Sequence, residues 1–187
     1  MIYVLGLLIA MLVIDIVRLR SRAGMLVVLA PSDEPATHRA IGEIDPATLR
    51  AASAHMRATA IEVLDIVPRD LPALRAMGML QLVDPAKYRK SRLVPGWTCA
   101  HALVVTEDVF ARARPGTPKN DLEMTRLARR LKAFGKADFA IAPSEHARPA
   151  DLSLRFALLQ LAFGPGASFT LALVVGVWAV LGFGVAL

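Results

Sequence analysis

The sequence predicts an α/β domain with a small, mostly parallel four-stranded sheet and flanking helices, plus one or two transmembrane helices. Short apolar runs alternate with segments of helical periodicity, an order typical of parallel sheets covered by helices. Apolar residues make up 55% of the 187 positions, and the excess lies at the two ends of the chain. We therefore expect an N-terminal membrane anchor (residues 1–23), a cytoplasmic α/β domain (24–148), an interfacial helix and turn (149–166) and a C-terminal transmembrane helix (167–187).

The C-terminal segment carries the stronger membrane signal. Residues 156–187 contain no charged side chain, and Gly164-Pro165-Gly166 separates a leucine-rich stretch from the last 21 residues. At about 1.5 Å per residue, roughly 20 residues of helix cross a hydrocarbon core about 30 Å thick. Residues 167–187 are therefore long enough to span a bilayer.

Small residues recur along one side of this segment, and small residues let membrane helices approach closely. This stripe predicts a contact with the N-terminal span or with a partner subunit; the alternative is that glycine and alanine are simply common in membrane helices. Its members are Ala172, Gly176, Ala179 and Ala186.

The N-terminal segment is a shorter candidate anchor. Residues 2–17 are apolar except for Asp15, and no Lys or Arg precedes them, whereas Arg18 and two more arginines follow. A cleaved signal peptide would carry positive charge first, so the pattern favours an uncleaved anchor with its N-terminus outside. The alternative is a buried or surface-lying helix.

Net charge is +6, and every Lys and Arg lies between Arg18 and Arg155, that is, between the apolar ends. The positive-inside rule then places the intervening domain on the cytoplasmic side, as in a bacterial inner-membrane protein. We expect membrane lipids and other membrane-protein subunits as partners, and no nucleic acid.

Within the domain, apolar runs predict strands and capping residues predict the starts of helices. Strands are expected at residues 25–30, 61–67, 101–106 and 138–142. Asp45-Pro46, Asp70 and Glu107 each begin a predicted helix, the second of these running to Leu82, where Asp84-Pro85 ends it. A further helix covers residues 120–134, with Asn120 and Glu123 as a capping box and Gly135 as its stop.

Three residues near the predicted strands carry reactive side chains. Cys99 and His101 could form a nucleophile or bind a metal, or they are a small buried cysteine and a satisfied histidine. Asp65 lies inside an apolar strand, either as an active-site carboxylate or in an ion pair with an arginine at the edge of the core. No ligand spacing or nucleotide-binding motif points to a metal or cofactor.

A basic run with aromatic neighbours follows the second predicted helix. Basic and aromatic side chains together favour the membrane interface; a solvated loop and a binding loop for an acidic ligand are the alternatives. The run comprises Lys87, Tyr88, Arg89, Lys90 and Arg92, with Trp97 just beyond.

Residues 96–106 (GWTCAHALVVT), 120–135 (NDLEMTRLARRLKAFG) and 143–164 resemble, in order and spacing, the later part of membrane-bound family 2 glycosyltransferases of the GT-A type. The resemblance implies that Asp121 is a candidate catalytic base. Asn120 stands where that family has Glu, and Gln160 lacks the Arg-Trp pair that follows it there. No Asp-x-Asp motif occurs, so the resemblance implies a partial member without the family's metal site.

Two functions follow from these observations. The first is a membrane-anchored accessory or interaction subunit with a cytoplasmic α/β domain, part of a larger membrane complex. The second is a degenerate or partial family 2 glycosyltransferase-like protein that acts at the membrane face. The missing motifs favour a protein without catalytic activity, and the resemblance favours an enzyme.

Overall fold

The structure is a computed structural model that describes residues 2–72, 75–76, 79–80, 83–91, 94 and 96–147. The described residues from Arg22 onward belong to one compact unit, and the part of helix α1 (Ile2–Ala23) before Arg22 belongs to another. The predicted interfacial helix and C-terminal transmembrane helix, with the stripe Ala172, Gly176, Ala179 and Ala186, lie outside the described residues.

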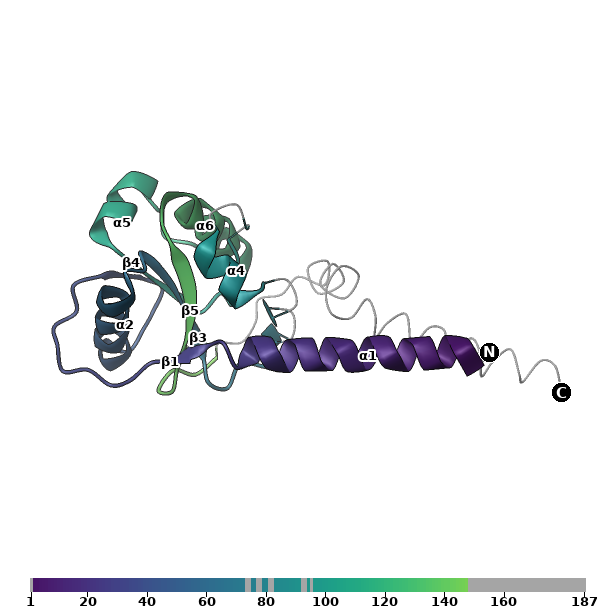
Figure 1. The fold of residues 1–187 in the computed structure, drawn as a ribbon. Coiled ribbons are helices and arrows are strands. Elements are labelled where there is room, and N and C mark those ends of the chain that lie inside the picture. Colours follow the sequence, from purple (N-terminus) through teal and green to yellow (C-terminus); the bar gives the residue numbers. More distant parts are fainter. Residues whose placement is uncertain are drawn as a thin grey trace. The chain divides into compact units, whose positions relative to one another are not determined.

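The α/β unit is built on a five-stranded mixed sheet with the order β1-β5-β3-β4-β2 (Figure 1). The pairs β1–β5 and β5–β3 are parallel, whereas β3–β4 and β4–β2 are antiparallel. The strands are β1 (Val27–Val28), β2 (Arg39–Ile41), β3 (Val63–Pro68), β4 (Ala102–Val105) and β5 (Ala137–Ala142).

The α/β class is confirmed, but the prediction of four mostly parallel strands is wrong. The four predicted strands are present, and β2 adds a fifth from a segment that reads as turns. A strand of three residues is too short for its apolar and polar side chains to show the alternation that identifies a strand in a sequence. The strand β2 forms through its pairing with β4, in which Ala40 lies opposite Val104. Residues 69–101 return the chain antiparallel to β3, a direction that the alternation of strands and helices does not specify.

Helices cover both faces of this sheet. In Figure 1, α2 (Pro46–Thr59) lies on one side, and α4 (Pro85–Lys90) and α6 (Asp121–Phe134) lie on the other. Two predicted caps are confirmed: Asp45 accepts hydrogen bonds from Ala47 and Thr48, and Asn120 accepts one from Glu123. The cap predicted at Asp70 is wrong: residues 70–72 are not helical, and the Asp70 carboxylate accepts the backbone N–H of Ala147 instead.

Residues 87–90 of the basic run are helical. Asp84, predicted only to end the preceding helix, accepts hydrogen bonds from the backbone N–H groups of Ala86 and Lys87 and so begins α4. Of the helix predicted from Asp70 to Leu82, the described residues 75–76 and 79–80 are helical.

An apolar layer lies between α2 and the sheet. It contains Ala52 and Met56 of α2 together with Leu64 and Ile66 of β3, each at most 1% exposed. On α6, the buried apolar residues are Met124, Leu127, Ala128 and Leu131, which recur at spacings of one, three and four along one face of the helix. Helix α5 (Glu107–Ala113) contributes Val109 and Ala113 to the buried residues.

Gly135 ends α6 as predicted, but for a different reason. Its backbone is extended (φ −143°, ψ 163°), so it is not the left-handed stop that glycine commonly provides. A Cβ at this position would lie 2.9 Å from the Cβ of Glu62 and 3.0 Å from the Cγ2 of Val109. Glycine is therefore required by the close approach of neighbouring side chains.

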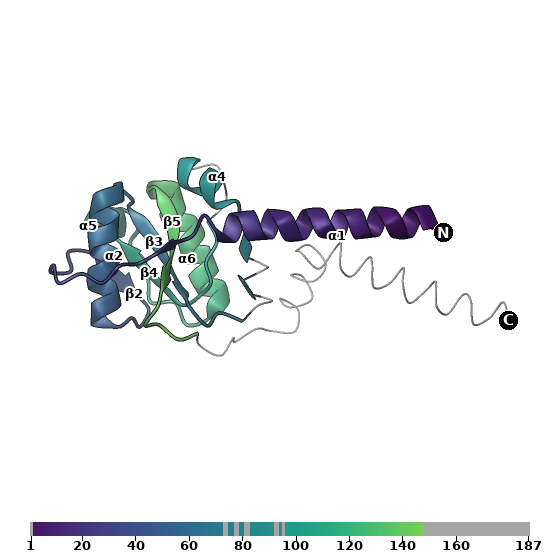
Figure 2. The same ribbon diagram turned by 60° about the horizontal axis from the view of Figure 1, so that its bottom comes forward.

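Helix α1 contains 22 residues and exposes several large apolar side chains, which are Ile9, Val13, Ile14, Ile16 and Val17. Figure 2 shows it as a single uninterrupted helix. Within the described ranges, no helix combines the length and the apolar character that crossing a membrane requires.

Candidate functional site

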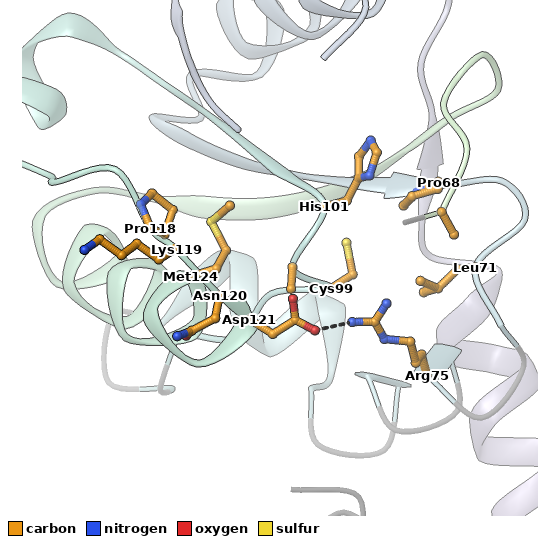
Figure 3. A pocket seen from close by; sticks show the side chains of 12 residues that line it. Pro68, Leu71, Arg75, Cys99, His101, Pro118, Lys119, Asn120, Asp121 and Met124 are labelled. Carbon is orange, nitrogen blue, oxygen red and sulfur yellow. Dashed lines mark hydrogen bonds and ion pairs between the residues drawn. The ribbon is translucent and has the colours of Figure 1, made fainter. Parts of the chain in front are cut away.

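A pocket of about 130 Å³ lies where the connection into β4, the start of α6 and the segment after β5 meet (Figure 3). Three of the predicted site residues line it, namely Cys99, His101 and Asp121. Arg75 and Lys119 add positive charge to its wall. The remaining lining residues are Pro68, Leu71, Ala100, Pro118, Asn120, Met124 and Ala147.

Asp121 faces Arg75 across this pocket. The Arg75 guanidinium donates to the Asp121 carboxylate at 2.9 Å, and both side chains are largely buried. Asp121 is the first residue of α6, where the positive end of the helix dipole also favours a negative charge. The candidate base of the glycosyltransferase resemblance is therefore held as an ion-paired carboxylate at the pocket wall.

Cys99 and His101 lie two residues apart but have different partners. Ala100 between them has φ +60°, and β4 begins only at Ala102, so the two side chains do not share one face of a regular strand. The Cys99 thiol lies 3.0 Å from both Asp65 Oδ1 and the Ile66 carbonyl oxygen. In Figure 3, the His101 ring points away from the Asp121–Arg75 pair.

The thiol of Cys99 is kept protonated. Burial raises its pKa well above the usual value, and the neighbouring Asp65 carboxyl raises it further. Because the thiolate is the nucleophile and the metal ligand, this environment opposes both roles. The surroundings match the alternative of a small buried cysteine that donates a hydrogen bond.

Asp65 is 2% exposed in the middle of β3, and its partner is a thiol rather than the predicted arginine. Burial raises the pKa of Asp65 to about 7, because the charged form is costly away from water, and the hydrogen bonds from Thr98 and Cys99 offset only part of this. Asp65 lies behind Cys99 and does not line the pocket. It is a carboxyl group that can change its charge near neutral pH.

His101 contacts Glu145, which follows β5 in the chain. The His101 Nε2 lies 2.9 Å from Glu145 Oε2, while Glu145 Oε1 accepts the backbone N–H of Asp45 at 2.7 Å. Burial alone would raise the pKa of Glu145, but the hydrogen bonds from Asp45 and His101 outweigh it and leave this pKa lowered. The carboxylate therefore accepts from Nε2, and the buried Nδ1 of His101 has no hydrogen-bond partner among the described residues.

The predicted lipid-contacting residues separate into buried and exposed groups. Tyr88 is 2% exposed: its ring centroid lies 4.5 Å from that of Phe139, and the buried ammonium group of Lys132 lies 4.1 Å above the ring. Burial raises the pKa of Tyr88, so its hydroxyl stays protonated. Trp97 is half-buried, and its ring is 6.4 Å from that of Phe139.

The charged members of the run lie further out. Lys87, Arg89 and Lys90 are exposed, and Arg89 also binds the buried Asp138 at 2.7 Å. The lipid contact stays a prediction for these three side chains, whereas Tyr88 would have to leave its packed position to reach a membrane surface. The side chain of Arg92 lies outside the described residues.

Two residues of the site were not predicted. Two turn residues separate Glu145 from the end of β5. Because α/β folds commonly place functional side chains just after strand ends, this position could have been used to predict Glu145. Arg75 belongs to a mainly apolar helical segment and carries no such signal. Within the described part of the chain, no three His, Cys, Asp or Glu side chains gather as metal ligands would.

Comparison with protein-family models, with curated proteins and with solved structures finds no match to this chain.

Proposed function

We propose that this protein is a membrane-anchored accessory or interaction subunit, with its α/β domain on the cytoplasmic side as part of a larger membrane complex. The observation that carries the proposal is the state of the polar groups at the pocket. Asp121 is paired with Arg75, Glu145 with His101, and Cys99 donates to its neighbours. The Cys99 thiol is hydrogen-bonded to Asp65 and Ile66 rather than to His101, so the pocket lacks the paired nucleophile and base that nucleophilic catalysis needs.

The size of the pocket also supports this function. Its volume is about 130 Å³, whereas sites for small molecules and cofactors commonly measure about 300–1,000 Å³. A pocket this small has room for a few waters or a small ion rather than for a sugar nucleotide.

Membrane attachment is proposed from the two ends of the chain. The apolar side chains that α1 exposes, such as Ile14 and Val17, would lie against lipid or a partner helix, and Arg18 and Arg20 follow at the cytoplasmic boundary. The charge-free residues 156–187 supply the second attachment in this proposal.

Chemical crosslinking of the full chain in its own membrane, followed by purification in mild detergent and native mass spectrometry, tests the proposal. We expect one defined partner at fixed stoichiometry, retained when Asp121→Asn is introduced. A chain that purifies alone, and that crosslinks only to varying neighbours, would contradict the function of an accessory subunit.

The second candidate is a glycosyltransferase-like activity at the membrane face. One observation favours it: Asp121, the residue that the resemblance carries over, lines the pocket beside Arg75, whose charge could hold an acidic donor. This candidate requires saturable binding of a sugar nucleotide with Mg²⁺ or Mn²⁺, measured by calorimetry and lost in Asp121→Asn. The matched control is Asp108→Asn on the surface of α5, which should bind as the wild type does. Absence of binding by the wild type would exclude this candidate.

A further inference from the structure

A second hollow lies beside α6, and Pro118 lines both this hollow and the pocket of Asp121. Its volume is about 190 Å³, which corresponds to about six water molecules at roughly 30 Å³ each. This groove is therefore large enough for a tetrahedral anion and part of the group that carries it. The groove is lined by Gly116, Thr117, Pro118, Glu123, Arg126, Leu127 and Arg130.

Two guanidinium groups dominate the charge of this groove. Arg126 and Arg130 are four residues apart on α6, so they project from the same side of the helix on successive turns. Both are exposed, and among the described residues neither has a hydrogen-bond or ion-pair partner. Water screens the repulsion between two exposed guanidinium groups, so what this pair offers to an anion is two neighbouring charge-assisted hydrogen-bond donors.

One acidic side chain also lines the groove. Glu123 accepts the backbone N–H of Lys119 through Oε2 at 2.8 Å, and its own N–H is bound by the cap Asn120. It therefore has a structural role at the start of α6, and the groove keeps an excess of one positive charge. The hydroxyl of Thr117, which also lines the groove, supplies a neutral hydrogen-bond donor.

From this arrangement we infer that the groove binds a phosphate group. Each guanidinium presents five N–H donors in a planar fork that matches the oxygens of phosphate, and such charge-assisted pairs are among the strong hydrogen bonds. A carboxylate has only two oxygens, whereas a phosphate has enough to engage Arg126, Arg130 and Thr117 together. The phosphate belongs either to a soluble phosphate ester or to a phospholipid headgroup, and both present the same chemistry to the groove.

The inference is independent of the proposed function, because it uses none of the polar groups that line the Asp121 pocket. Asp121→Asn should leave phosphate binding unchanged. The phosphate site and the proposed accessory function can therefore be disproved independently of each other.

Calorimetric titration of the full chain in mild detergent tests the site with three probes: inorganic phosphate, glycerol 3-phosphate and short-chain phosphatidic acid. We expect saturable binding of at least one. Binding of the first two identifies a soluble phosphate ester as the natural source. Binding of phosphatidic acid alone identifies a lipid headgroup.

Single neutral substitutions locate the site. Arg126→Gln and Arg130→Gln should each weaken binding about tenfold, because each removes a charge-assisted pair. Arg129→Gln is the matched control: it is exposed on the same helix, removes the same charge and does not line the groove, so it should change affinity less than about twofold. Arg126→Lys keeps the charge but not the fork, and should weaken binding less than Arg126→Gln.

Two results would overturn the inference. One is the absence of saturable binding of all three probes by the wild-type chain. The other is an equal loss in Arg129→Gln and Arg126→Gln, which would show attraction to the general positive charge of α6 rather than to this groove. Because all three arginines are exposed, circular dichroism should show the same folded domain in every variant.

Discussion

Asp65 and Asp138 are two buried aspartates on adjacent parallel strands, and the protein accommodates them in opposite ways. Leu64 of β3 lies beside Asp138 of β5, and Asp65 lies beside Phe139, so the two carboxyl groups point to opposite faces of the sheet. Their exposures are 2% and 1%. In the sequence, each is an aspartate next to apolar residues of a predicted strand, and nothing local indicates which partner it will have.

The difference lies in the partner that tertiary structure provides. Asp138 Oδ2 lies 2.7 Å from the Arg89 guanidinium, which reaches it from α4. Asp65 has a neutral thiol as its partner, and burial raises its pKa to about 7. A buried carboxyl is therefore either paired with a cation or pushed towards its neutral form, and the two faces of one sheet show both solutions.

The largest expected effect on the free energy of unfolding comes from apolar packing, and it serves as the reference for the effects of the two buried aspartates. Leu131 of α6 is fully buried, so Leu131→Ala should lower the free energy of unfolding by about 2–5 kcal/mol. Leu122→Ala, on the same helix but 48% exposed, is the control and should change it by less than about 0.5 kcal/mol. Urea unfolding of the full chain in detergent, followed by circular dichroism, measures both. Equal effects would mean that α6 does not pack through Leu131.

The ion pair of Asp138 is tested by removing the guanidinium group of Arg89. Arg89→Met leaves a carboxylate buried without its ion-pair partner, which should lower the free energy of unfolding by about 3 kcal/mol. This value is at the lower end of the range for broken buried pairs, because the Arg89 side chain is itself partly exposed. The control is Lys90→Met on the same helix, exposed and expected to change stability by less than about 0.5 kcal/mol. If the double variant Arg89→Met with Asp138→Asn is no more stable than Arg89→Met alone, the cost does not come from the unpaired carboxylate.

The raised pKa of Asp65 predicts that the free energy of unfolding depends on pH. Its pKa is about 7 in the folded protein and 3.8 when unperturbed, so between these values the unfolded chain releases a proton that the folded chain keeps. Stability therefore falls as pH rises through this window, by about 1.4 kcal/mol per unit from this group. Asp65→Asn should remove that part of the slope.

Unfolding free energies at several pH values between about 4 and 7 make the measurement. Asp33→Asn, at an exposed position, serves as the control and should keep the wild-type slope. A wild-type slope that Asp65→Asn leaves intact would mean that Asp65 is ionised in the folded protein.

The smallest expected effect concerns Asp45, which is an exposed aspartate rather than a buried one. Asp45 is exposed and accepts the N–H groups of Ala47 and Thr48 at 3.1 and 3.3 Å, so it caps α2 as a solvated carboxylate. Asp45→Ala should lower the unfolding free energy by about 1 kcal/mol. Asp33→Ala is the control, and thermal unfolding of both variants should separate the cap from a general loss of surface charge.

The sequence by itself determined the local elements of this protein. Asp45-Pro46 and Asn120 mark the starts of α2 and α6 because a cap involves residues only two or three positions apart. The runs that contain β1, β3, β4 and β5 were visible as continuous apolar segments, which is the pattern of buried strands, and β3, β4 and β5 are buried as that pattern indicates. Local hydrogen bonding and local burial leave a pattern that can be read within about ten residues.

Tertiary structure alone decided how these elements pair and which polar groups meet. The strand β2 and the antiparallel direction of β4 depend on hydrogen bonds between distant segments. The contacts of the site join residues that are far apart in the chain, so no spacing in the sequence indicates them. Asp65 and Cys99 are 34 positions apart, His101 and Glu145 are 44 apart, and Arg75 and Asp121 are 46 apart.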